Sequence, residues 1–130
     1  MEMLLRLCVI GTGGAIGSVL RYLVSGWVQD RSGSIAFPYG TTAVNLSGCF
    51  VMGFLAWLVE ARSLFSPETR AFLLIGLLGG FTTFSTFGNE TLNLVRNGRV
   101  ELAMLYVGAH VIAGVGMVWL GRLVAFGIWR

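Results

Sequence analysis

Charged and chemically reactive residues are scarce in this sequence. Only 12% of its 130 residues are charged, every basic residue is an arginine, and there are one histidine and two cysteines. Ordinary soluble domains carry about 25% charged residues, so this composition is not that of a soluble enzyme. The formal net charge is only +3, and its carriers are scattered along the chain. We therefore expect no polyanion, and in particular no nucleic acid, as a partner.

The few reactive side chains form no catalytic or metal-binding pattern. The sequence has no nucleophile–base pair with an orienting third group, no glycine loop for phosphates and no ligand spacing of cysteine and histidine. We therefore expect no enzyme. Cys8 and Cys49 lie in apolar stretches and are expected to be core thiols rather than a disulfide or a metal pair. A haem clamp usually needs two histidines, so we expect the single His110 to be packed or hydrogen-bonded.

Apolar residues dominate instead. The hydrophobic fraction is 55% before the 19 glycines are counted, and the mean hydropathy is +0.79. Soluble domains are about 45–50% apolar with glycine included. A 14.0 kDa chain has too much surface for its volume to hide this much apolar side chain from water. Lipid must therefore solvate most of the chain, whose length allows a single domain.

Four apolar stretches are long enough to cross a bilayer as helices. About 20 helical residues span its ~30 Å hydrocarbon core, whereas strands would need an alternating polarity that the sequence does not show. The first stretch is too long for the apolar part of a signal peptide and has no cleavage pattern. Ser66 followed by Pro67 predicts a helix start before the third stretch. We predict one all-α transmembrane domain over residues 1–130, with four spans at about 7–28, 39–59, 71–95 and 102–124.

Pairs of small residues four apart predict close packing between these helices. The pairs are Gly13 and Gly17, Ala43 and Ser47, Gly76 and Gly80, and Ala109 and Ala113. In lipid, such faces let helix backbones approach one another. The pattern is a packing signal and carries no chemistry by itself.

The arginines give almost no preference for one orientation in the membrane. Four spans place both termini on one side. That side would carry Arg6, Arg62, Arg70, Arg122 and Arg130, and the other side Arg21, Arg31, Arg96 and Arg99. Cytoplasmic loops normally carry a clear excess of positive charge. Either so few arginines are a weak signal, or the chain inserts both ways and pairs with an inverted copy of itself. The charges leave both interpretations open.

The third span has a polar centre. Residues 79–87 read GGFTTFSTF, with two glycines and four hydroxyl side chains. Such a segment is a poor helix core, because glycine is conformationally free and Ser and Thr compete for backbone partners. We predict that the helix breaks or unwinds between Gly79 and Thr83. Broken backbone at membrane depth persists only where it is buried in protein or lines a cavity, and its free carbonyls could hold a small cation. The alternative is a Ser/Thr-rich packing kink.

Other polar or aromatic side chains inside the spans are candidates for an ion pathway. Asn45 either bonds a neighbouring helix or solvates something that passes. Phe84 and Phe87 share a face if that half of the span is helical, and ring edges beside amide and hydroxyl donors would favour a small anion. Arg21 either snorkels to the interface or gives a vestibule its positive potential. Glu90, the one acid well inside a span, has a vestibule or an interhelical role.

Three segments together resemble the Fluc (CrcB) fluoride-channel family. They are residues 13–22 (GGAIGSVLRY), 40–48 (GTTAVNLSG) and 79–87 (GGFTTFSTF), and their order and spacing agree with the family. The resemblance covers essentially the whole chain. It implies a channel of the cell inner (plasma) membrane that exports fluoride passively and lowers cytoplasmic fluoride. It also implies an antiparallel, dual-topology homodimer with two fluoride pores and a structural sodium ion at its centre.

The resemblance implies roles for individual residues. The implied pore residues, which face fluoride, are Asn45, Phe84, Ser85, Thr86, Phe87 and Tyr106. The implied vestibule residues are Arg21 and Glu90. The implied sodium ligands, through their backbone carbonyls, are Gly79 and Thr82. The resemblance assigns no role to His110.

Two other classes of small membrane protein are alternatives. A four-helix multidrug exporter also uses inverted dimers, but it needs an acid in its first span to bind protons and cationic drugs. The first span here has only Arg6 and Arg21 near its ends. A structural or cofactor-anchoring subunit is disfavoured by the lone His110 and by the polar centre of the third span.

Overall fold

The structure is a computed structural model that describes residues 2–129, in which all regular elements are helical. The first two are α1 (Glu2–Ser32) and α2 (Tyr39–Arg62). The third rod is built from α3 (Pro67–Arg70), the π-helical η1 (Ala71–Leu77), α4 (Leu78–Phe81) and α5 (Phe84–Arg96). The fourth rod is built from α6 (Val100–Gly108), the π-helical η2 (Ala109–Ala113) and α7 (Gly114–Ile128).

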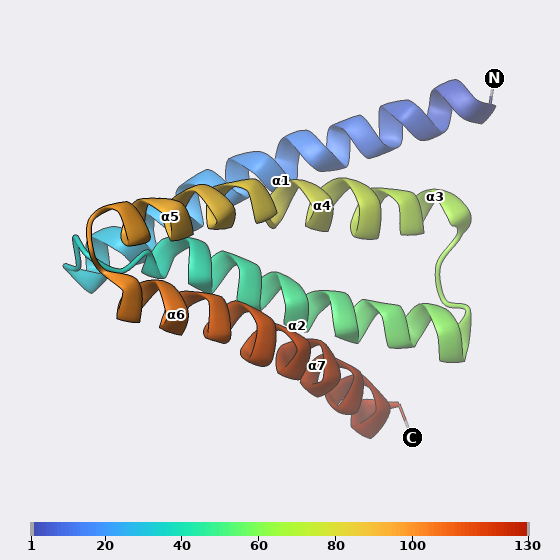
Figure 1. The fold of residues 1–130 in the computed structure, drawn as a ribbon. Coiled ribbons are helices and arrows are strands. Elements are labelled where there is room, and N and C mark those ends of the chain that lie inside the picture. The colour runs from blue at the N-terminus through green and yellow to red at the C-terminus, as the bar shows by residue number, and fades with distance from the viewer. Residues whose placement is uncertain (1, 130) are drawn as a thin grey trace.

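All four rods are long and apolar enough to cross a membrane. Each of the four expected spans lies inside one of them. Both ends of the chain lie at one end of the molecule, and the turns between α1 and α2 and between α5 and α6 lie at the other (Figure 1). The third rod begins as predicted, because Ser66 Oγ accepts a hydrogen bond from Thr69 N at 3.2 Å and Pro67 occupies the first turn.

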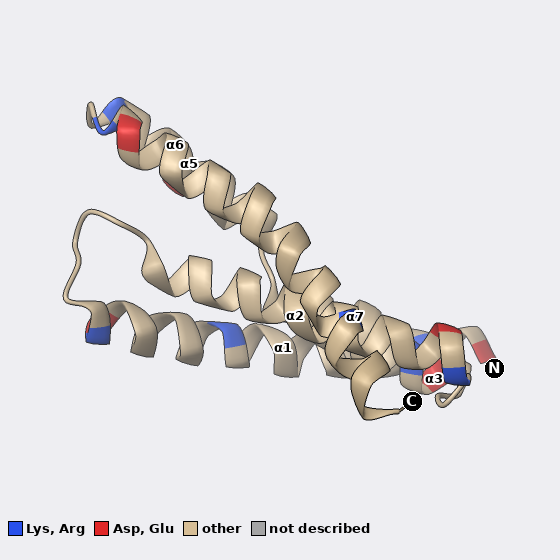
Figure 2. Cartoon of the chain, turned by 90° about the horizontal axis from the view of Figure 1, so that it is seen from below, with Lys and Arg blue, Asp and Glu red and all other residues tan. Residues whose placement is uncertain are grey.

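Charge gathers at the two ends of the molecule (Figure 2). At the end that carries the termini, Arg122 forms an ion pair with Glu60. At the other end, the Arg31 guanidinium lies over the Trp27 ring, 5.4 Å from its centroid. Arg130, which the sequence places with the first group, lies outside the described residues. Basic residues at both ends leave the orientation of the chain in the membrane open.

Glycines bring α1 against the third rod. A Cβ atom added to Gly17 would collide with the Leu77 carbonyl oxygen, and one added to Gly80 would collide with the Gly14 carbonyl oxygen. These backbones are therefore in direct contact, as helices in lipid become when only small residues separate them. The predicted packing role of the small residues in the first and third spans is confirmed.

The second and fourth rods meet in the same way. A Cβ atom on Gly53 of α2 would collide with the Val118 carbonyl oxygen, and one on Gly121 of α7 with the Phe50 carbonyl oxygen. The four-residue spacing did not single out these two glycines. The molecule thus consists of two tightly packed helix pairs.

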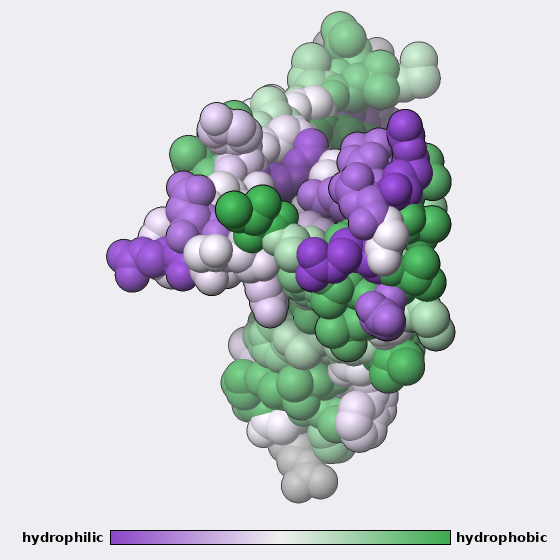
Figure 3. Space-filling model, turned by 60° about the vertical axis from the view of Figure 1, so that its left-hand side comes forward, coloured by the Kyte–Doolittle hydropathy of each residue, from purple (hydrophilic) through white to green (hydrophobic). Residues whose placement is uncertain are grey.

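Within each pair, the two rods diverge toward the end that carries the α1–α2 and α5–α6 turns. In Figure 2 the α5–α6 hairpin separates from the α1–α2 hairpin. Figure 3 looks toward this end and shows hydrophilic side chains gathered there, with hydrophobic ones on the flanks. Tyr106 and Val44 are the largest fully buried side chains among residues 2–129, so a single copy has only a small core.

The loop between α1 and α2 reaches across the gap. Phe37 in this loop packs edge-on against Tyr106 of α6, with 5.5 Å between ring centroids. Gln29 holds the loop, since its Nε2 donates to the Phe37 carbonyl at 3.2 Å and its Oε1 accepts from Gly40 N at 3.0 Å. The loop therefore helps to position the start of α2 beneath the α5–α6 hairpin.

The glycine contacts predict a sharp difference between two substitutions in α1. Gly17→Ala should lower the free energy of unfolding by about 1–3 kcal/mol, because the new methyl group forces α1 away from the third rod. Gly11→Ala should be neutral or stabilising by up to about 1 kcal/mol, because nothing lies within 4 Å of an added Cβ there. Equilibrium unfolding of both variants in detergent micelles measures the difference. Equal stabilities would contradict the packing described.

Candidate functional site

The third rod breaks at Thr82 and Thr83. Both residues are extended, with φ −85° and ψ 160° at Thr82 and φ −151° and ψ 116° at Thr83. The break lies within the predicted range of residues 79–83, but the reason given for it was incomplete. Gly79 and Gly80 remain helical in α4, where Gly80 serves the close contact with α1. The extended residues are the two threonines that follow.

Asn45 of α2 closes the break with two hydrogen bonds. Thr83 N donates to Asn45 Oδ1 at 2.8 Å, and Asn45 Nδ2 donates to the Thr83 carbonyl at 3.0 Å. Both residues are buried, with 9% exposure each. The Asn45 amide oxygen thus replaces the helical acceptor that Thr83 N has lost, which matters because an unpaired backbone group in lipid costs several kcal/mol (on the order of the amide transfer penalty).

The two bonds also fix where the rest of the Asn45 amide points. An amide nitrogen carries two hydrogens, and only one of them is used on Thr83. The second makes no hydrogen bond with any of residues 2–129. Of the two roles that the sequence left open for Asn45, the structure therefore provides the interhelical bond and leaves one N–H available for a ligand.

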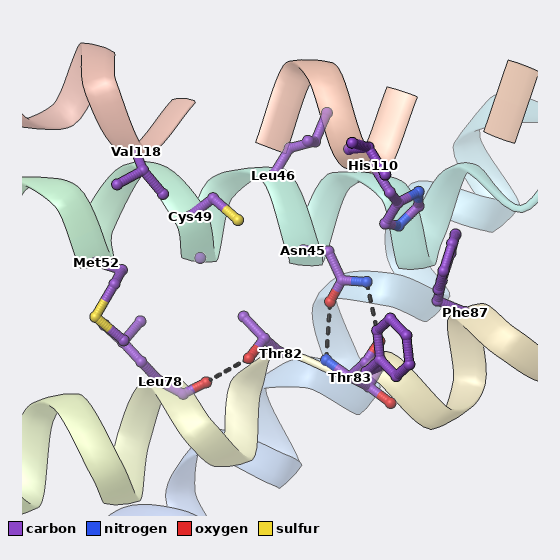
Figure 4. A pocket seen from close by; sticks show the side chains of 13 residues that line it. Asn45, Leu46, Cys49, Met52, Leu78, Thr82, Thr83, Phe87, His110 and Val118 are labelled. Carbon is purple, nitrogen blue, oxygen red and sulfur yellow. Dashed lines mark hydrogen bonds between the residues drawn. The ribbon is translucent and has the colours of Figure 1, made fainter. Parts of the chain in front are cut away.

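A cavity of about 330 Å³ lies beside this amide. Figure 4 shows Asn45, Thr83, Phe87 and His110 around one end of it, and aliphatic side chains from α2, α4 and α7 around the other. Most of its wall is apolar, so the Asn45 amide, the two threonines of the break and the histidine are the polar groups that border it. Such a cavity, with few polar groups in an apolar wall, is typical of a small-ligand site.

Four aromatic rings cluster around Phe87, and three of them, those of Phe84, Phe87 and His110, line the cavity. Phe84 and Phe87 are neighbours, with 5.5 Å between centroids, which confirms that they share a face of α5. Phe87 also packs against Tyr106 at 5.3 Å and against His110 at 4.4 Å. Phe87 is partly buried, whereas Phe84 also borders the cavity but is 83% exposed.

Tyr106 is hydrogen-bonded to Glu90. The Tyr106 hydroxyl donates to Glu90 Oε2 at 2.6 Å, and Thr41 Oγ1 donates to Glu90 Oε1 at 3.0 Å. Since a phenol has one proton, Tyr106 cannot donate to an anion while this bond stands. Of the roles left open for Glu90, the interhelical bond is therefore present. Sequence reasoning missed Thr41, although it lies four residues before Asn45 and hence on the same face of α2.

Arg21 turns inward rather than toward the membrane surface. Its Nη1 donates to the Thr82 carbonyl at 3.2 Å. It borders a second cavity of about 350 Å³ that Thr41, Thr83 and Thr86 also line. A third, polar cavity of about 420 Å³ lies nearer the short turns and is bordered by Glu90. Both candidate vestibule residues, Arg21 and Glu90, therefore border cavities on the α1 side of the break.

The candidate residues fall into two groups. Those buried or half-buried around the break and the cavities are Arg21, Asn45, Thr82, Phe87, Glu90 and Tyr106. Those exposed at the surface are Gly79, Phe84, Ser85 and Thr86, of which Phe84 and Thr86 also border a cavity. Thr83 Oγ1 links the groups, because it caps α5 by accepting from Thr86 N at 3.2 Å and donates to Thr86 Oγ1 at 3.0 Å. One chain alone does not bring all of these residues together.

The donors available to a metal ion are backbone oxygens. Among residues 2–129, no group of three or more histidine, cysteine or acidic side chains could hold a metal. The Gly79 carbonyl loses its usual helical donor, Thr83 N, to Asn45. The Thr82 carbonyl accepts from Arg21. Carbonyl oxygens suit a hard cation, but two of them from one chain are too few to enclose it.

Comparison with known proteins gives consistent matches over most of the chain. The sequence profile of the family described as "CrcB-like protein, Camphor Resistance (CrcB)" matches residues 8–122. A protein of Methylobacillus flagellatus named "Fluoride-specific ion channel FluC" is 44% identical over 116 residues, which cover 89% of this chain and 91% of that protein. Proteins with the same name from Parabacteroides distasonis and Rhizobium meliloti are 47% and 41% identical, and the matches cover 91% and 96% of each chain, respectively.

The hydrogen bonds of Asn45 predict a large effect on stability. Asn45→Leu should lower the free energy of unfolding by about 1–3 kcal/mol, because it leaves Thr83 N unpaired and removes one of the bonds that the Thr83 carbonyl accepts. Ser47→Ala is the matched control on the same helix, since the Ser47 hydroxyl bonds only to the Val44 carbonyl one turn earlier. Unfolding in detergent micelles compares the two. If Asn45→Leu were no less stable than Ser47→Ala, Asn45 would not hold the break.

Proposed function

The chain belongs to the CrcB-like family, and on this premise we propose that it is a fluoride-selective channel through which fluoride leaves the cytoplasm passively. The names of its relatives support fluoride as the ion. The observation that carries the proposal within the molecule is the broken third helix, where an amide with a free N–H borders a narrow, largely apolar cavity. Export down the gradient would keep cytoplasmic fluoride low.

The chemistry of fluoride fits this site. Fluoride is small and tightly hydrated, so a pore must replace its water with close donors. A neutral amide N–H, hydroxyls and the positive edges of aromatic rings can do so without a full charge that would trap the ion. Conduction needs binding that is favourable enough for the ion to come in and weak enough for it to leave. We propose Asn45, Phe84, Phe87, Ser85 and Thr86 as the groups that face fluoride.

The remaining residues have supporting roles in this proposal. Arg21 gives the vestibule a positive potential that draws anions inward. Tyr106 lies against Phe87 and presents its ring, because its hydroxyl proton is held by Glu90. Glu90 thereby fixes the ring, and its own negative charge is offset by two donated hydrogen bonds.

We propose that the channel is an antiparallel homodimer with two pores, each lined by both copies. Two observations support a second copy. Phe84, Ser85 and Thr86 are exposed on the single chain at the level of the break, and polar groups at membrane depth are costly unless protein or water covers them. The arginines divide almost evenly between the two ends, which suits a chain that inserts in both directions.

We further propose that a structural sodium ion lies between the two copies, held by the carbonyls of Gly79 and Thr82 from each. Four such oxygens would form a cage that one chain cannot provide. Gly79 is exposed and nothing lies within 4 Å of a Cβ atom added there, so a partner backbone can approach closely. Since Arg21 now bonds the Thr82 carbonyl, its guanidinium must withdraw when the cation binds, because two positive charges repel.

The four apolar rods make the chain a multi-pass membrane protein. We propose that it lies in the cell inner (plasma) membrane, because only a channel in that membrane lets fluoride leave the cytoplasm by passive export. Lipid then covers the apolar outer faces, on which large side chains such as Tyr22 and Ile112 are each 78% exposed.

The test is fluoride efflux from liposomes that contain the purified protein, followed with a fluoride electrode. With valinomycin present to balance charge with potassium, we expect rapid fluoride efflux and little or no chloride efflux. Proton-driven efflux of an organic cation without fluoride flux would instead identify a multidrug exporter and overturn the proposal.

Phe84 allows the pore to be tested without disturbing the fold. Phe84→Leu should lower the flux roughly five- to tenfold, because it removes a ring-edge contact of about 1 kcal/mol. Its 83% exposure predicts little effect on the folding of the single chain. Trp119→Leu, which removes an aromatic ring that is 64% exposed on α7, is the matched control and should conduct normally. Normal flux in Phe84→Leu would remove this ring from the pathway.

Dual topology can be measured with a single accessible thiol. In a background carrying Cys8→Ser and Cys49→Ser, Asn97→Cys adds a thiol in the exposed α5–α6 turn without changing the charge. A membrane-impermeant maleimide applied to intact cells should label about half of the copies, because the two orientations are equally populated. Labelling of all copies or of none would show a single orientation and would exclude the antiparallel dimer.

A further inference from the structure

His110 has a buried nitrogen without a partner. Its Nε2 makes no hydrogen bond with any of residues 2–129, although it is shielded from solvent. Buried polar atoms are nearly always paired, and an unpaired one costs about 1–3 kcal/mol, so each exception requires a reason. The residue lies in η2, a π-helical turn, and such turns are frequent at functional sites.

The surroundings of this nitrogen point to a ligand. His110 borders the same cavity as Asn45 and Phe87 (Figure 4). Its ring lies on that of Phe87, with 4.4 Å between centroids and 35° between planes. Nε2 therefore lies close to the pathway along which the proposed function moves fluoride.

The hydrogen bond at the other ring nitrogen fixes the neutral tautomer. His110 Nδ1 lies 2.9 Å from the Tyr106 carbonyl oxygen. A carbonyl can only accept, so Nδ1 carries the hydrogen and, in the neutral ring, Nε2 carries a lone pair. A lone pair beside the pathway repels an anion. When Nε2 is protonated, the same atom becomes a charged N–H donor.

We propose that His110 is a proton-dependent fluoride ligand, so that fluoride binding in this chain is coupled to protonation of its only histidine. This inference rests on the proposed function and adds a regulation to that site. In the neutral state Asn45 and the ring edges act without His110. In the protonated state the Nε2–H joins them, and binding of fluoride in turn favours the protonated ring, since coupling between two ligands is reciprocal.

The other ionisable groups near His110 are few. From α2, Cys49 borders the same cavity. From α5, Glu90 faces Tyr106, whose ring lies 4.4 Å from that of His110. From α1, the Arg21 guanidinium reaches the break at the Thr82 carbonyl.

Because this is the only histidine of the chain, one label reports on it alone. Protein with ¹⁵N-labelled histidine, reconstituted in lipid nanodiscs at about pH 7, should show its Nε2 resonance moving toward the position of the protonated ring when sodium fluoride is added. Sodium chloride at the same concentration should leave the resonance where it was. A resonance that does not respond to fluoride would overturn the inference.

Flux measurements test the coupling in a second way. Between about pH 8 and pH 5.5, the fluoride concentration that gives half-maximal flux should fall roughly tenfold, within the range typical of coupled sites. Protein-free liposomes correct for hydrogen fluoride that crosses the bilayer unaided. His110→Gln, which keeps an amide in place of the imidazole but cannot titrate, should lose the pH dependence.

Two further variants separate His110 from its neighbours. Cys49→Ser and Glu90→Gln should each retain the pH dependence, because the proton is bound at His110. Loss of the dependence in either variant together with its persistence in His110→Gln would overturn the inference. Fluoride flux that is the same at every pH would also overturn it while leaving the proposed function intact, whereas absence of fluoride flux at every pH would overturn the proposed function itself.

Discussion

The pair of hydrogen bonds between the Asn45 amide and the Thr83 backbone is the interaction on which the rest of the site depends. Lipid offers no partner to an open backbone, so a helix can be interrupted inside a membrane only where side chains replace the missing bonds. Asn45 does this with one donor and one acceptor at the correct spacing. The break is thereby held at a fixed position, and α5 starts with Phe84. The rings of Phe84, Phe87 and His110, which contact one another in turn, then border the cavity.

The glycine contacts fix the helices that surround this site. They fix the pair formed by α1 with the third rod and the pair formed by α2 with α7 at backbone contact. Beyond these contacts, the two rods of each pair separate toward the end that carries the α1–α2 and α5–α6 turns, and the polar cavities lie there. Within this gap, Phe37 of the preceding loop and Thr41 and Asn45 on one face of α2 each contact the third or fourth rod. The loop and the start of α2 therefore bridge the gap.

The sequence was sufficient to predict four membrane-length helical rods, the start of the third rod at Ser66 and a break within residues 79–83. Apolar run length, helix caps and helix-breaking composition are local properties, so the sequence alone is enough to predict them. The contacts of Glu90 with Thr41 and Tyr106 could not be predicted, because hydropathy does not fix how each helix is rotated about its axis. The two π-helical turns were also missed, and with them the position of the His110 ring. The reason for the break was only partly right, since the threonines supply the extended residues as expected, whereas Gly80 serves packing against α1.

The hydrogen bond from Arg21 to the Thr82 carbonyl has a consequence for how the protein is made. With that bond and those of Asn45, a newly synthesised chain provides hydrogen-bond partners for backbone groups at the break without a second molecule. The chain therefore holds its own break without a second molecule. For the dimer that we propose, biogenesis would then need no coordination between two ribosomes, and the guanidinium would temporarily occupy the place of the proposed ion.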